Sequence, residues 1–558
     1  MKPVSATAFP LLAAALLCHC GAPQVPRCTH VPYASQVPAA TLTHNAREAW
    51  GILAKPSCRD EWPAAQATYN ANVAKLFDQL RCGPGTWDSR AAALGTRIAR
   101  PDARQVNMEK LDALFPAASV STYFLGPRRC SDGLGVPLVG WKKTTPVGTP
   151  RPAFELPTGL PYPATATLDF GGATPIWHFD KRWLFNDTRI GTNPQPLAAD
   201  WSAPNAFYWH MSNLDELKIL NIFLPGRFSE ETGLYFLQPY DPAKIPLVLV
   251  HGLASSPDAF KTTINDLAPE PWFRQHYQIW LYNYPTGNPW LLSSMRFRQH
   301  LRQACAYART KGGDQSLKRM VIVGHSMGGL IARSSVTPPG RAFYDAYFKT
   351  PIEQLELPEA SRRVIREETL FQPLPEPRRV VFLAVPHRGS PAATLRISVL
   401  ISKLIKLPKQ LSVELLDTTV QTLGKVLDGS ALQPQVPTSI NTLSPTDKSI
   451  LALDKLPLPP AISFHSVIGD RGKGDTPASS DGIVPYWSSH VAPVASETIV
   501  PSNHRVTHCP ATSEELKRIL KLHLENSRRQ DSRRQDSRRE DSRRQKTRND
   551  DCAAQAPE

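Results

Sequence analysis

One segment of the sequence has residue types and spacing that suit nucleophilic catalysis. Gly324–Gly328 (GHSMG) follows the apolar run Met320–Val323 and precedes a helical pattern that starts near Gly329. A hydrolase nucleophile must protrude from a sharp turn between a strand and a helix. The backbone of such a turn is strained and tight, so small residues are needed two positions before and after the serine. The segment therefore predicts that Ser326 is a nucleophile.

A serine nucleophile also needs hydrogen-bond donors that stabilise the oxyanion of a tetrahedral intermediate. We expect the amide of Met327, directly after the serine, to be one donor. The other donor should lie in the turn after an upstream strand, and His251-Gly252-Leu253 follows the apolar run Pro246–Val250 there. We expect the amide of Leu253 to be this second donor, with Gly252 making room and His251 only shaping the turn.

The segments HGLASSP and GHSMGGLIAR resemble those of the α/β-hydrolase superfamily, in particular its lipase and GPI-inositol-deacylase-like branch. The resemblance covers roughly residues 245–525. It implies a bacterial exported serine hydrolase that cleaves esters, with its catalytic triad in the order serine, acid, histidine along the chain. The 210 residues upstream more loosely resemble the leading regions of uncharacterised bacterial exported hydrolases.

The order of the triad directs the search for the acid downstream of Ser326. Asp470, Asp475 and Asp481 follow the strand-like run Ala461–Ile468. Asp481 begins the segment DGIVP, which resembles the acid-bearing turn of these lipases, and is the preferred acid. Asp470, closer to the end of the strand, is the alternative. The acid would hold the imidazole in one tautomer and stabilise its protonated form.

The histidine of the triad is expected on a later loop. His504 is the first histidine after the strand-like run Thr498–Pro501 and matches the position of the base in the family. Asn503 stands where the family usually has glycine. His508 is the alternative base.

These residues require a sheet to position them. Apolar runs alternate with helical patterns from residue 245 onward: Pro246–Val250, Tyr277–Tyr282, Met320–Val323, Arg379–Ala384 and Ala461–Ile468. This alternation indicates a mostly parallel sheet with helices on both faces. With the resemblance, it predicts an α/β-hydrolase fold for a catalytic domain at residues 241–525. His387, after the fourth run, and His465, inside the fifth, are expected to be structural.

A long insertion at about residues 390–450 separates the fourth run from the acid. Its apolar residues Ile397, Leu400, Ile401, Leu404 and Ile405 line one helical face, and basic residues flank them. A basic amphipathic helix beside such a site is either a lid that meets a lipid surface or an ordinary cap over the pocket. Both readings imply a hydrophobic acyl substrate.

The chain begins with a pattern typical of export. In residues 1–20, Lys2 precedes the apolar run Phe9–Cys18, which is too short to span a membrane but suits a secretory signal. Cys18 and Cys20 stand where a lipoprotein signal places its acylated cysteine, although larger residues precede them. We therefore expect an exported protein that is periplasmic or associated with the cell envelope, with a lipid anchor as one form of that association.

Two regions lie between this signal and the catalytic domain. Residues 30–117 are predicted to be helical, because the apolar residues of Glu61–Arg81 recur at steps of three and four. Residues 118–240 contain short β-like runs, such as Ala164–Phe170 and Gly233–Leu237, and are predicted to form a β-rich accessory region.

The cysteines and glycines predict neither a metal nor a cofactor. Cys28, Cys58, Cys82 and Cys130 are close enough in the sequence to form two disulfides in an oxidising compartment, or to remain separate thiols. No cysteine or histidine cluster has the spacing of a zinc site, and no glycine-rich phosphate loop is present.

The net charge of +15 first suggests an anionic partner. Residues 526–558 form an Arg-rich repeat tail with almost no apolar residues, which predicts disorder. Residues 527–558 hold ten basic and seven acidic residues, a net of only +3, so most of the excess is spread along the chain. No nucleic-acid recognition motif accompanies it. We expect a monomer that meets an anionic membrane surface and a hydrophobic ester or lipid substrate.

The leading hypothesis is a serine esterase or lipase that acts on carboxylic esters through an acyl-enzyme. A phospholipase, thioesterase or acyltransferase with the same triad is the first alternative. A non-catalytic binding protein with a hydrolase fold is the second, and the intact set of serine, acid and histidine argues against it.

Overall fold

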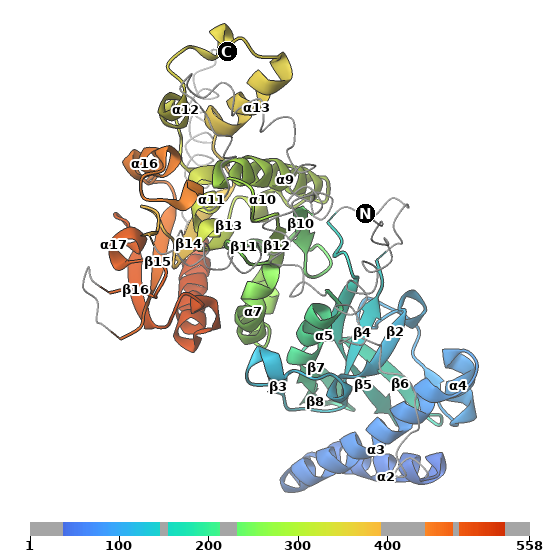
Figure 1. Ribbon diagram of the computed structural model, residues 1–558. Helices are drawn as coiled ribbons and strands as arrows, with labels where there is room; N and C mark the ends of the chain where they lie inside the picture. The colour runs from blue at the N-terminus through green and yellow to red at the C-terminus, as the bar shows by residue number, and fades with distance from the viewer. Residues whose placement is uncertain (1–36, 145–153, 213–231, 392–440, 473–478, 530–558) are drawn as a thin grey trace, which may run out of the picture. The chain divides into compact units, whose positions relative to one another are not determined.

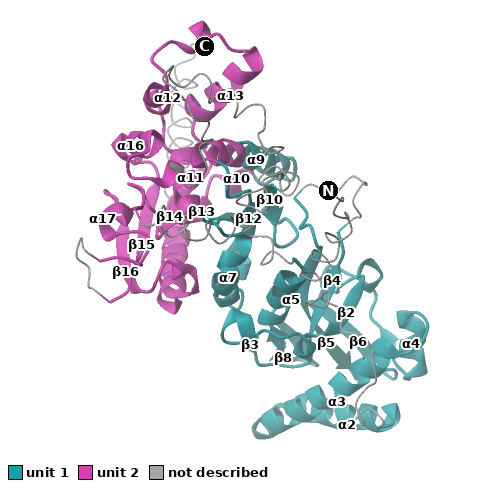
Figure 2. Ribbon diagram, in the orientation of Figure 1, with its two compact units in different colours: residues 1–288, 299–313 teal, residues 289–298, 314–558 magenta. Residues whose placement is uncertain are grey.

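The structure is a computed structural model that describes residues 37–144, 154–212, 232–391, 441–472 and 479–529 (Figure 1). The chain divides into two compact units: residues 1–288 with 299–313, and residues 289–298 with 314–558 (Figure 2). Several predicted features lie outside the described residues: the signal at 1–20, Asp475, the insertion from 392 to 440 and the tail from 530.

The first unit begins with three helices, α2 (Ala39–Leu53), α3 (Trp62–Cys82) and α4 (Trp87–Ala93). The predicted helix at residues 61–81 is confirmed, because α3 buries its apolar residues at steps of three and four. Beyond α4 the chain enters short strands, so part of residues 30–117 belongs to a sheet. Cys82 is disulfide-bonded, whereas Cys58 and Cys130 are free, so the two-disulfide arrangement is wrong.

A five-stranded sheet follows these helices, in the order β1-β6-β5-β4-β2. Its strands are β1 (Arg97–Ile98), β2 (Ala113–Pro116), β4 (Val136–Lys142), β5 (Leu160–Asp169) and β6 (Ile176–Lys181). Neighbouring strands are antiparallel except β1 and β6, which are parallel. Phe77 of α3 packs against Trp177 and Phe179 of β6, with ring centroids 6.4 and 6.1 Å apart. The helices and this sheet therefore share one core.

A buried tyrosine joins α3 to the sheet. The hydroxyl of Tyr69 donates to the carbonyl of Leu168 at 2.8 Å and accepts from the amide of Leu168 at 2.7 Å. Leu168 lies on β5 beyond the last residue of β5 that pairs with β4, which is Ala166. Both backbone groups of Leu168 are thus satisfied by one phenol.

The first unit also holds α5 (Ser202–Ser212) and three further strands, β10 (Gly233–Phe236), β11 (Ile245–Val250) and β12 (Tyr277–Asn283). β11 pairs with β12 in parallel, as the apolar runs predict. β10, which the sequence pattern grouped with the accessory region, pairs with β12 antiparallel. The short elements of this unit are β3 (Cys130–Ser131), β7 (Asp187–Ile190), β8 (Asn193–Pro196), β9 (Ala199–Asp200), α7 (Lys261–Leu267) and α8 (Pro271–His276).

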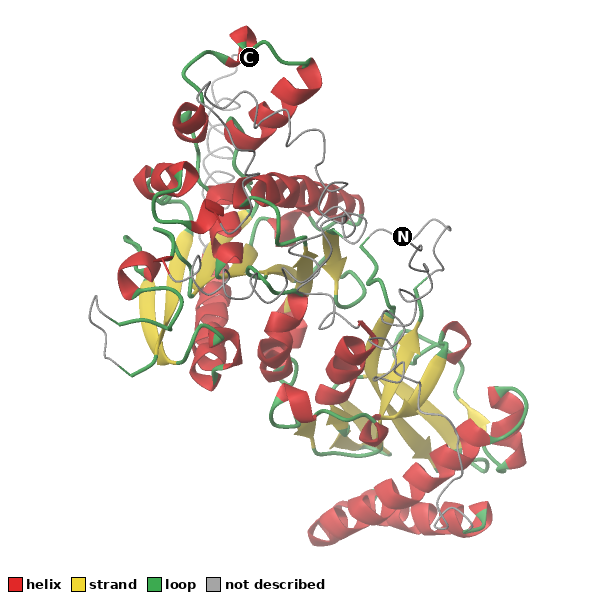
Figure 3. Cartoon of the chain, in the orientation of Figure 1, coloured by secondary structure: helices red, strands yellow, loops and turns green. Residues whose placement is uncertain are grey.

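The second unit contains a parallel sheet in the order β13-β14-β15-β16 (Figure 3). Its strands are β13 (Met320–His325), β14 (Pro377–Leu383), β15 (Ser463–Asp470) and β16 (Ser496–Pro501). The strands predicted from the apolar runs are confirmed, and the α/β class with them. α11 (Met327–Val336) packs against β13 and β14.

The described residues of the second half of the chain also form the α-helices α10 (Asp314–Leu317), α12 (Ala342–Tyr347), α13 (Glu359–Thr369), α16 (Lys448–Lys455), α17 (Tyr486–Ser489) and a helix at 510–529. α9 (Trp290–Thr310) contributes to both units. In the described part of the chain, no helix combines the length and apolar character needed to cross a bilayer.

Candidate active site

Ser326 lies between β13 and α11, at the strand-to-helix turn that the sequence predicts. Its φ of 54° is in the left-handed region that side chains with a Cβ avoid, so the turn is strained. A Cβ added to Gly324 would lie 2.6 Å from the carbonyl oxygen of Gly328, and one added to Gly329 would collide with Val385. The backbone of this turn is too close to its neighbours for larger residues, and the glycines are therefore required.

Ser326, His504 and Asp481 form one chain of hydrogen bonds. His504 Nε2 lies 2.9 Å from Ser326 Oγ, and His504 Nδ1 lies 2.7 Å from Asp481 Oδ2. Asp481 is 3% exposed and Ser326 7%, while the side chain of His504 is 16% exposed. All three residues belong to the second unit: Ser326 follows β13, Asp481 follows β15 and His504 follows β16. The carboxyl ends of these parallel strands bring the three side chains together.

The turn that carries Asp481 fixes the direction of its carboxylate. Oδ1 accepts from the amides of Ile483 at 2.8 Å and Val484 at 2.7 Å, which leaves Oδ2 for His504. A Cβ at Gly469 would lie 2.9 Å from the Cβ of Asp481, so β15 ends close against this turn. Asp470, the alternative acid, accepts instead from the amide of Gly472 at 3.1 Å.

The two candidate bases have different surroundings. His504 reaches both Ser326 and Asp481, whereas His508 lies exposed in the 3-10 helix η11 (Val506–His508). Asn503, at the position where glycine is usual, accepts from the amide of Arg505 at 2.9 Å and thereby shapes the loop. The departure from the family pattern therefore leaves His504 in place.

His325, to which the sequence pattern assigns no role, contacts His504. His325 Nε2 lies 2.8 Å from the carbonyl oxygen of His504, and only the Nε2–H tautomer can donate this hydrogen bond. Burial, followed by the nearby His504, lowers the pKa of His325 to about 3, so this ring is neutral at neutral pH. Its position next to Ser326 in the nucleophile motif is the only feature of the sequence that points to His325 as a residue of the site.

The remaining histidines of the sequence analysis are buried and contact neighbours away from this hydrogen-bond chain. His387 lies 3.3 Å from Arg333, and burial holds its pKa well below the usual value. His465 contacts Arg379 and lies 2.7 Å from Ser496 Oγ, and burial lowers its pKa to about 3. In the first unit, His251 stacks on Tyr284 with centroids 4.4 Å apart.

The expected oxyanion donors occupy different units. Met327 is the first residue of α11, where an α-helix leaves its amide groups without acceptors in the helix. Leu253 lies in the turn after β11 in the first unit. The pairing of the two amides around one oxyanion stays a prediction.

The arrangement is suited to moving one proton between a hydroxyl and an imidazole. A carboxylate at Nδ1 fixes the tautomer in which Nε2 accepts the serine proton, and it stabilises the imidazolium that results. Among the residues that the structure describes, no group of three or more histidine, cysteine or acidic side chains is placed to hold a metal ion.

No protein-family model matches the chain, and no curated protein matches it either. Solved structures to which it is similar include a lipase of Bacillus licheniformis, BlEst2 in its mature form, at 15% identity and a TM-score of 0.31, with 51% of this chain and 97% of that chain covered. Cfl2 from Burkholderia cenocepacia is 15% identical, with a TM-score of 0.27. The match covers 51% of this chain and 91% of Cfl2. Esterase B from Lactobacillus rhamnosis, solved with a tributyrin phosphonate inhibitor, is 12% identical, with a TM-score of 0.28. The match covers 58% of this chain and 94% of the esterase chain.

Proposed function

We propose that this protein is a serine hydrolase of the α/β-hydrolase superfamily that cleaves carboxylic esters with a hydrophobic acyl group. The observation that carries the proposal is the hydrogen-bond chain from Ser326 Oγ through His504 to Asp481. The positive φ of Ser326 on a strand-to-helix turn supports the proposal, because a turn of this kind exposes a nucleophile. The predicted cap or lid, with its apolar helical face, is the reason for preferring a hydrophobic substrate.

The reaction would proceed in two halves. Ser326 Oγ attacks the carbonyl carbon of the ester while its proton moves to His504 Nε2, and the amides of Met327 and Leu253 donate to the oxyanion. The tetrahedral intermediate then expels the alcohol, which takes the proton from His504. A water molecule attacks the acyl-enzyme in the same way and releases the carboxylic acid.

Covalent labelling tests the nucleophile directly. A fluorophosphonate probe should label the wild type, and Ser326→Ala should abolish labelling while the circular dichroism spectrum is unchanged. Labelling that persists in folded Ser326→Ala would remove Ser326 from the mechanism.

A pair of histidine variants tests the base. His504→Ala should lose activity on p-nitrophenyl esters by several orders of magnitude, since it removes the only imidazole within reach of Ser326 Oγ among the described residues. His508→Ala, four residues away on the same loop, is the matched control and should retain most of its activity. The reverse ranking would overturn the assignment.

Substrate class needs a separate measurement. Hydrolysis of p-nitrophenyl esters of increasing chain length, with and without phospholipid vesicles, measures the preference for acyl chain length and the effect of a lipid surface on activity. Activity that does not vary with chain length would contradict the hydrophobic acyl substrate.

We also propose that the protein is exported, with or without a lipid on Cys18 or Cys20. The disulfide at Cys82 supports this location, because disulfides persist in oxidising compartments. Fractionation of cells that express the full chain should recover it outside the cytoplasm, and deletion of residues 2–20 should retain it inside. Equal distribution of the two forms would contradict export.

A further inference from the structure

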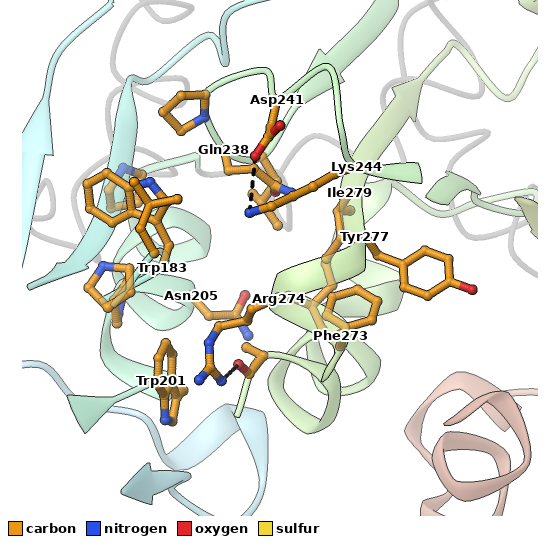
Figure 4. Close-up of a pocket in the computed structure, with 18 of the residues that line it drawn as sticks. Trp183, Trp201, Asn205, Gln238, Asp241, Lys244, Phe273, Arg274, Tyr277 and Ile279 are labelled. Atoms are coloured by element: carbon orange, nitrogen blue, oxygen red, sulfur yellow. Dashed lines mark hydrogen bonds and ion pairs between the residues drawn. The ribbon is translucent and has the colours of Figure 1, made fainter. Parts of the chain in front are cut away.

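The first unit contains a cavity that the catalytic proposal does not use. Its volume is about 330 Å³, and its walls come from β5, α5, the segment after β10, α8 and β12 (Figure 4). A volume near the lower end of the usual range for ligand pockets suits a small molecule of one narrow chain or ring.

Most of the wall is apolar. Trp183, Trp201, Tyr208, Phe273 and Tyr277 line the cavity together with several prolines. Leu184, which also lines it, is 47% exposed, and is one of the few large apolar side chains in the described residues that face solvent to this extent. A wall of this kind stabilises an apolar chain by removing its surface from water.

A lysine contributes the first positive charge to this wall. Lys244 is 8% exposed, and its Nζ lies 3.6 Å from the carboxylate of Asp241. Figure 4 shows its amino group extending into the space between Trp183 and Ile279. Burial lowers the pKa of Lys244, and Asp241, which lines the same cavity, opposes this effect.

An arginine contributes the second positive charge. Arg274 donates to three neutral acceptors, the carbonyl oxygens of Ala268 and Pro269 at 2.7 and 2.6 Å and Asn186 Oδ1 at 2.7 Å. Its guanidinium lies 3.7 Å from the centroid of Trp201. The guanidinium of Arg182 lies 5.2 Å from the centroid of the same indole.

The two guanidinium groups repel each other in this setting. Burial, together with the charge of Arg182, lowers the pKa of Arg274 to about 9, with Glu270 as a weaker opposing charge. Charges that are partly removed from water and share an aromatic ring favour a nearby anion.

We propose that this cavity binds a small amphipathic carboxylate, such as a medium-chain fatty acid, with its chain against the aromatic wall and its carboxylate beside Arg274, while Lys244 adds a second positive charge to the same cavity. Charge complementarity selects the head group, and the cavity volume limits the length of the chain. The proposal does not depend on catalysis by Ser326, although an ester hydrolase would release a ligand of this class.

A series of ligands with one tail and different head groups tests the proposal. Isothermal titration of the full chain carrying Ser326→Ala should show decanoate binding at one site, at least about tenfold more tightly than decanol or decylammonium, since the cations stabilise only the anion. Equal affinity for decanoate and decanol would overturn the role of the cations. Absence of saturable decanoate binding would overturn the site.

Two charge variants place the binding in this cavity. Arg274→Gln should weaken decanoate binding by about tenfold or more, Lys244→Gln should weaken it less, and both should leave the affinity for decanol unchanged. Lys318→Gln and Arg341→Gln are the matched controls, because each removes an exposed cation that is paired with an aspartate elsewhere, Lys318–Asp314 and Arg341–Asp345. Equal weakening by the controls would show that net charge, and not the cavity, governs binding.

A quenching experiment covers the case in which the Arg274 variant does not fold. A bromine-labelled decanoate should quench tryptophan fluorescence in the folded Ser326→Ala protein. Trp183→Phe should reduce the quenched fraction, and Trp87→Phe, on α4, should not. The same loss of quenching in both tryptophan variants would contradict binding beside Trp183. Because the Ser326→Ala protein lacks the proposed nucleophile, failure here leaves the catalytic proposal intact, and the reverse also holds.

Discussion

Ser326, His504 and Asp481 hold one another through hydrogen bonds of 2.9 and 2.7 Å. The cavity in the first unit instead combines apolar walls with two cations, Arg274, whose hydrogen-bond acceptors are neutral, and Lys244, which is paired with Asp241. In the first case each polar atom faces one particular atom, and the buried histidine beside the triad is neutral. In the cavity, positive charge is concentrated, but a ligand is not required to form a hydrogen bond in one particular direction.

The difference predicts different responses to substitution. A directional chain fails when one atom is replaced, because proton transfer needs the correct tautomer at the correct distance. A charged apolar cavity loses affinity by degrees, since each cation contributes separately. Activity and decanoate binding should therefore change independently in the variants below.

The largest effect is expected for Asp481→Asn. An asparagine can still accept from the amides of Ile483 and Val484, but its amino group would face His504 Nδ1 and favour the wrong tautomer. We expect kcat on a p-nitrophenyl ester to fall by about 10⁴-fold, with unchanged decanoate affinity. Asp470→Asn is the matched control and should retain activity within about tenfold. A larger loss at Asp470 would reassign the acid.

The next effect concerns the backbone around the nucleophile. Gly324→Ala places a methyl group 2.6 Å from backbone atoms of the next turn and should lower the free energy of unfolding by about 2 kcal/mol, together with the activity. Gly51→Ala, on α2, meets nothing within 4 Å and should raise the stability by about 0.5–1 kcal/mol. Thermal melts of both variants measure the opposite signs, and stabilisation by Gly324→Ala would contradict the tight turn.

A third test uses the pH dependence of stability, which buried titratable groups of the second unit determine. The folded-state pKa of His523 is about 4, mainly because of burial and Arg379, below its ordinary value of 6.5. The folded state therefore binds fewer protons than the unfolded state between these values, so the stability from neutral His523 is present above pH 6.5 and is lost as the pH falls towards 4. His325 and His465, each with a pKa of about 3, add to this loss. Glu368, whose pKa burial raises to about 7, opposes it.

The variant His523→Gln isolates one contribution to this dependence. Glutamine can accept from Arg379 and donate to the carbonyl of Arg319, as His523 does, but it does not titrate. The wild type should therefore lose more thermal stability than His523→Gln between pH 6.5 and 4.5. His44→Gln, at an exposed position, should follow the wild type. Parallel pH curves for wild type and His523→Gln would contradict a titrating His523.

The smallest effect is expected for His325, which contacts the base rather than the substrate. His325→Leu removes the donor to the carbonyl of His504 and should lower kcat by about tenfold with little change in KM. The acidic limb of the pH–rate profile should shift at the same time, which a merely structural change would not produce. His325→Gln, which retains a donor, should recover part of the activity. An unchanged pH–rate profile in His325→Leu would contradict a role of His325 in positioning His504.

The sequence was sufficient for the parts that depend on local pattern. The strands around Ser326 are continuous apolar runs, and the nucleophile turn is a short glycine-bounded segment, so neither depends on distant residues. His504 is preferred over His508 because it is the first histidine after a strand, and the structure places its ring within hydrogen-bonding distance of Ser326 and Asp481.

Other features depend on contacts between distant segments. The hydrogen bond from His325 to the carbonyl of His504 joins residues 179 positions apart. The cavity is lined by residues from Pro161 to Ile279, and no single segment contains its pattern. The short β-like run of β10 resembles those of the accessory region before it, and only its pairing with β12, a contact between distant segments, shows that it belongs to another sheet.

The bond between Tyr69 and Leu168 makes the sheet depend on a helix that lies 99 positions earlier in the chain. Both residues are fully buried, so water cannot replace the phenol. Tyr69→Phe would keep the ring but leave the amide and the carbonyl of Leu168 without this partner, and it is expected to lower the free energy of unfolding by about 1–3 kcal/mol. One oxygen atom of α3 therefore contributes to the stability of β5.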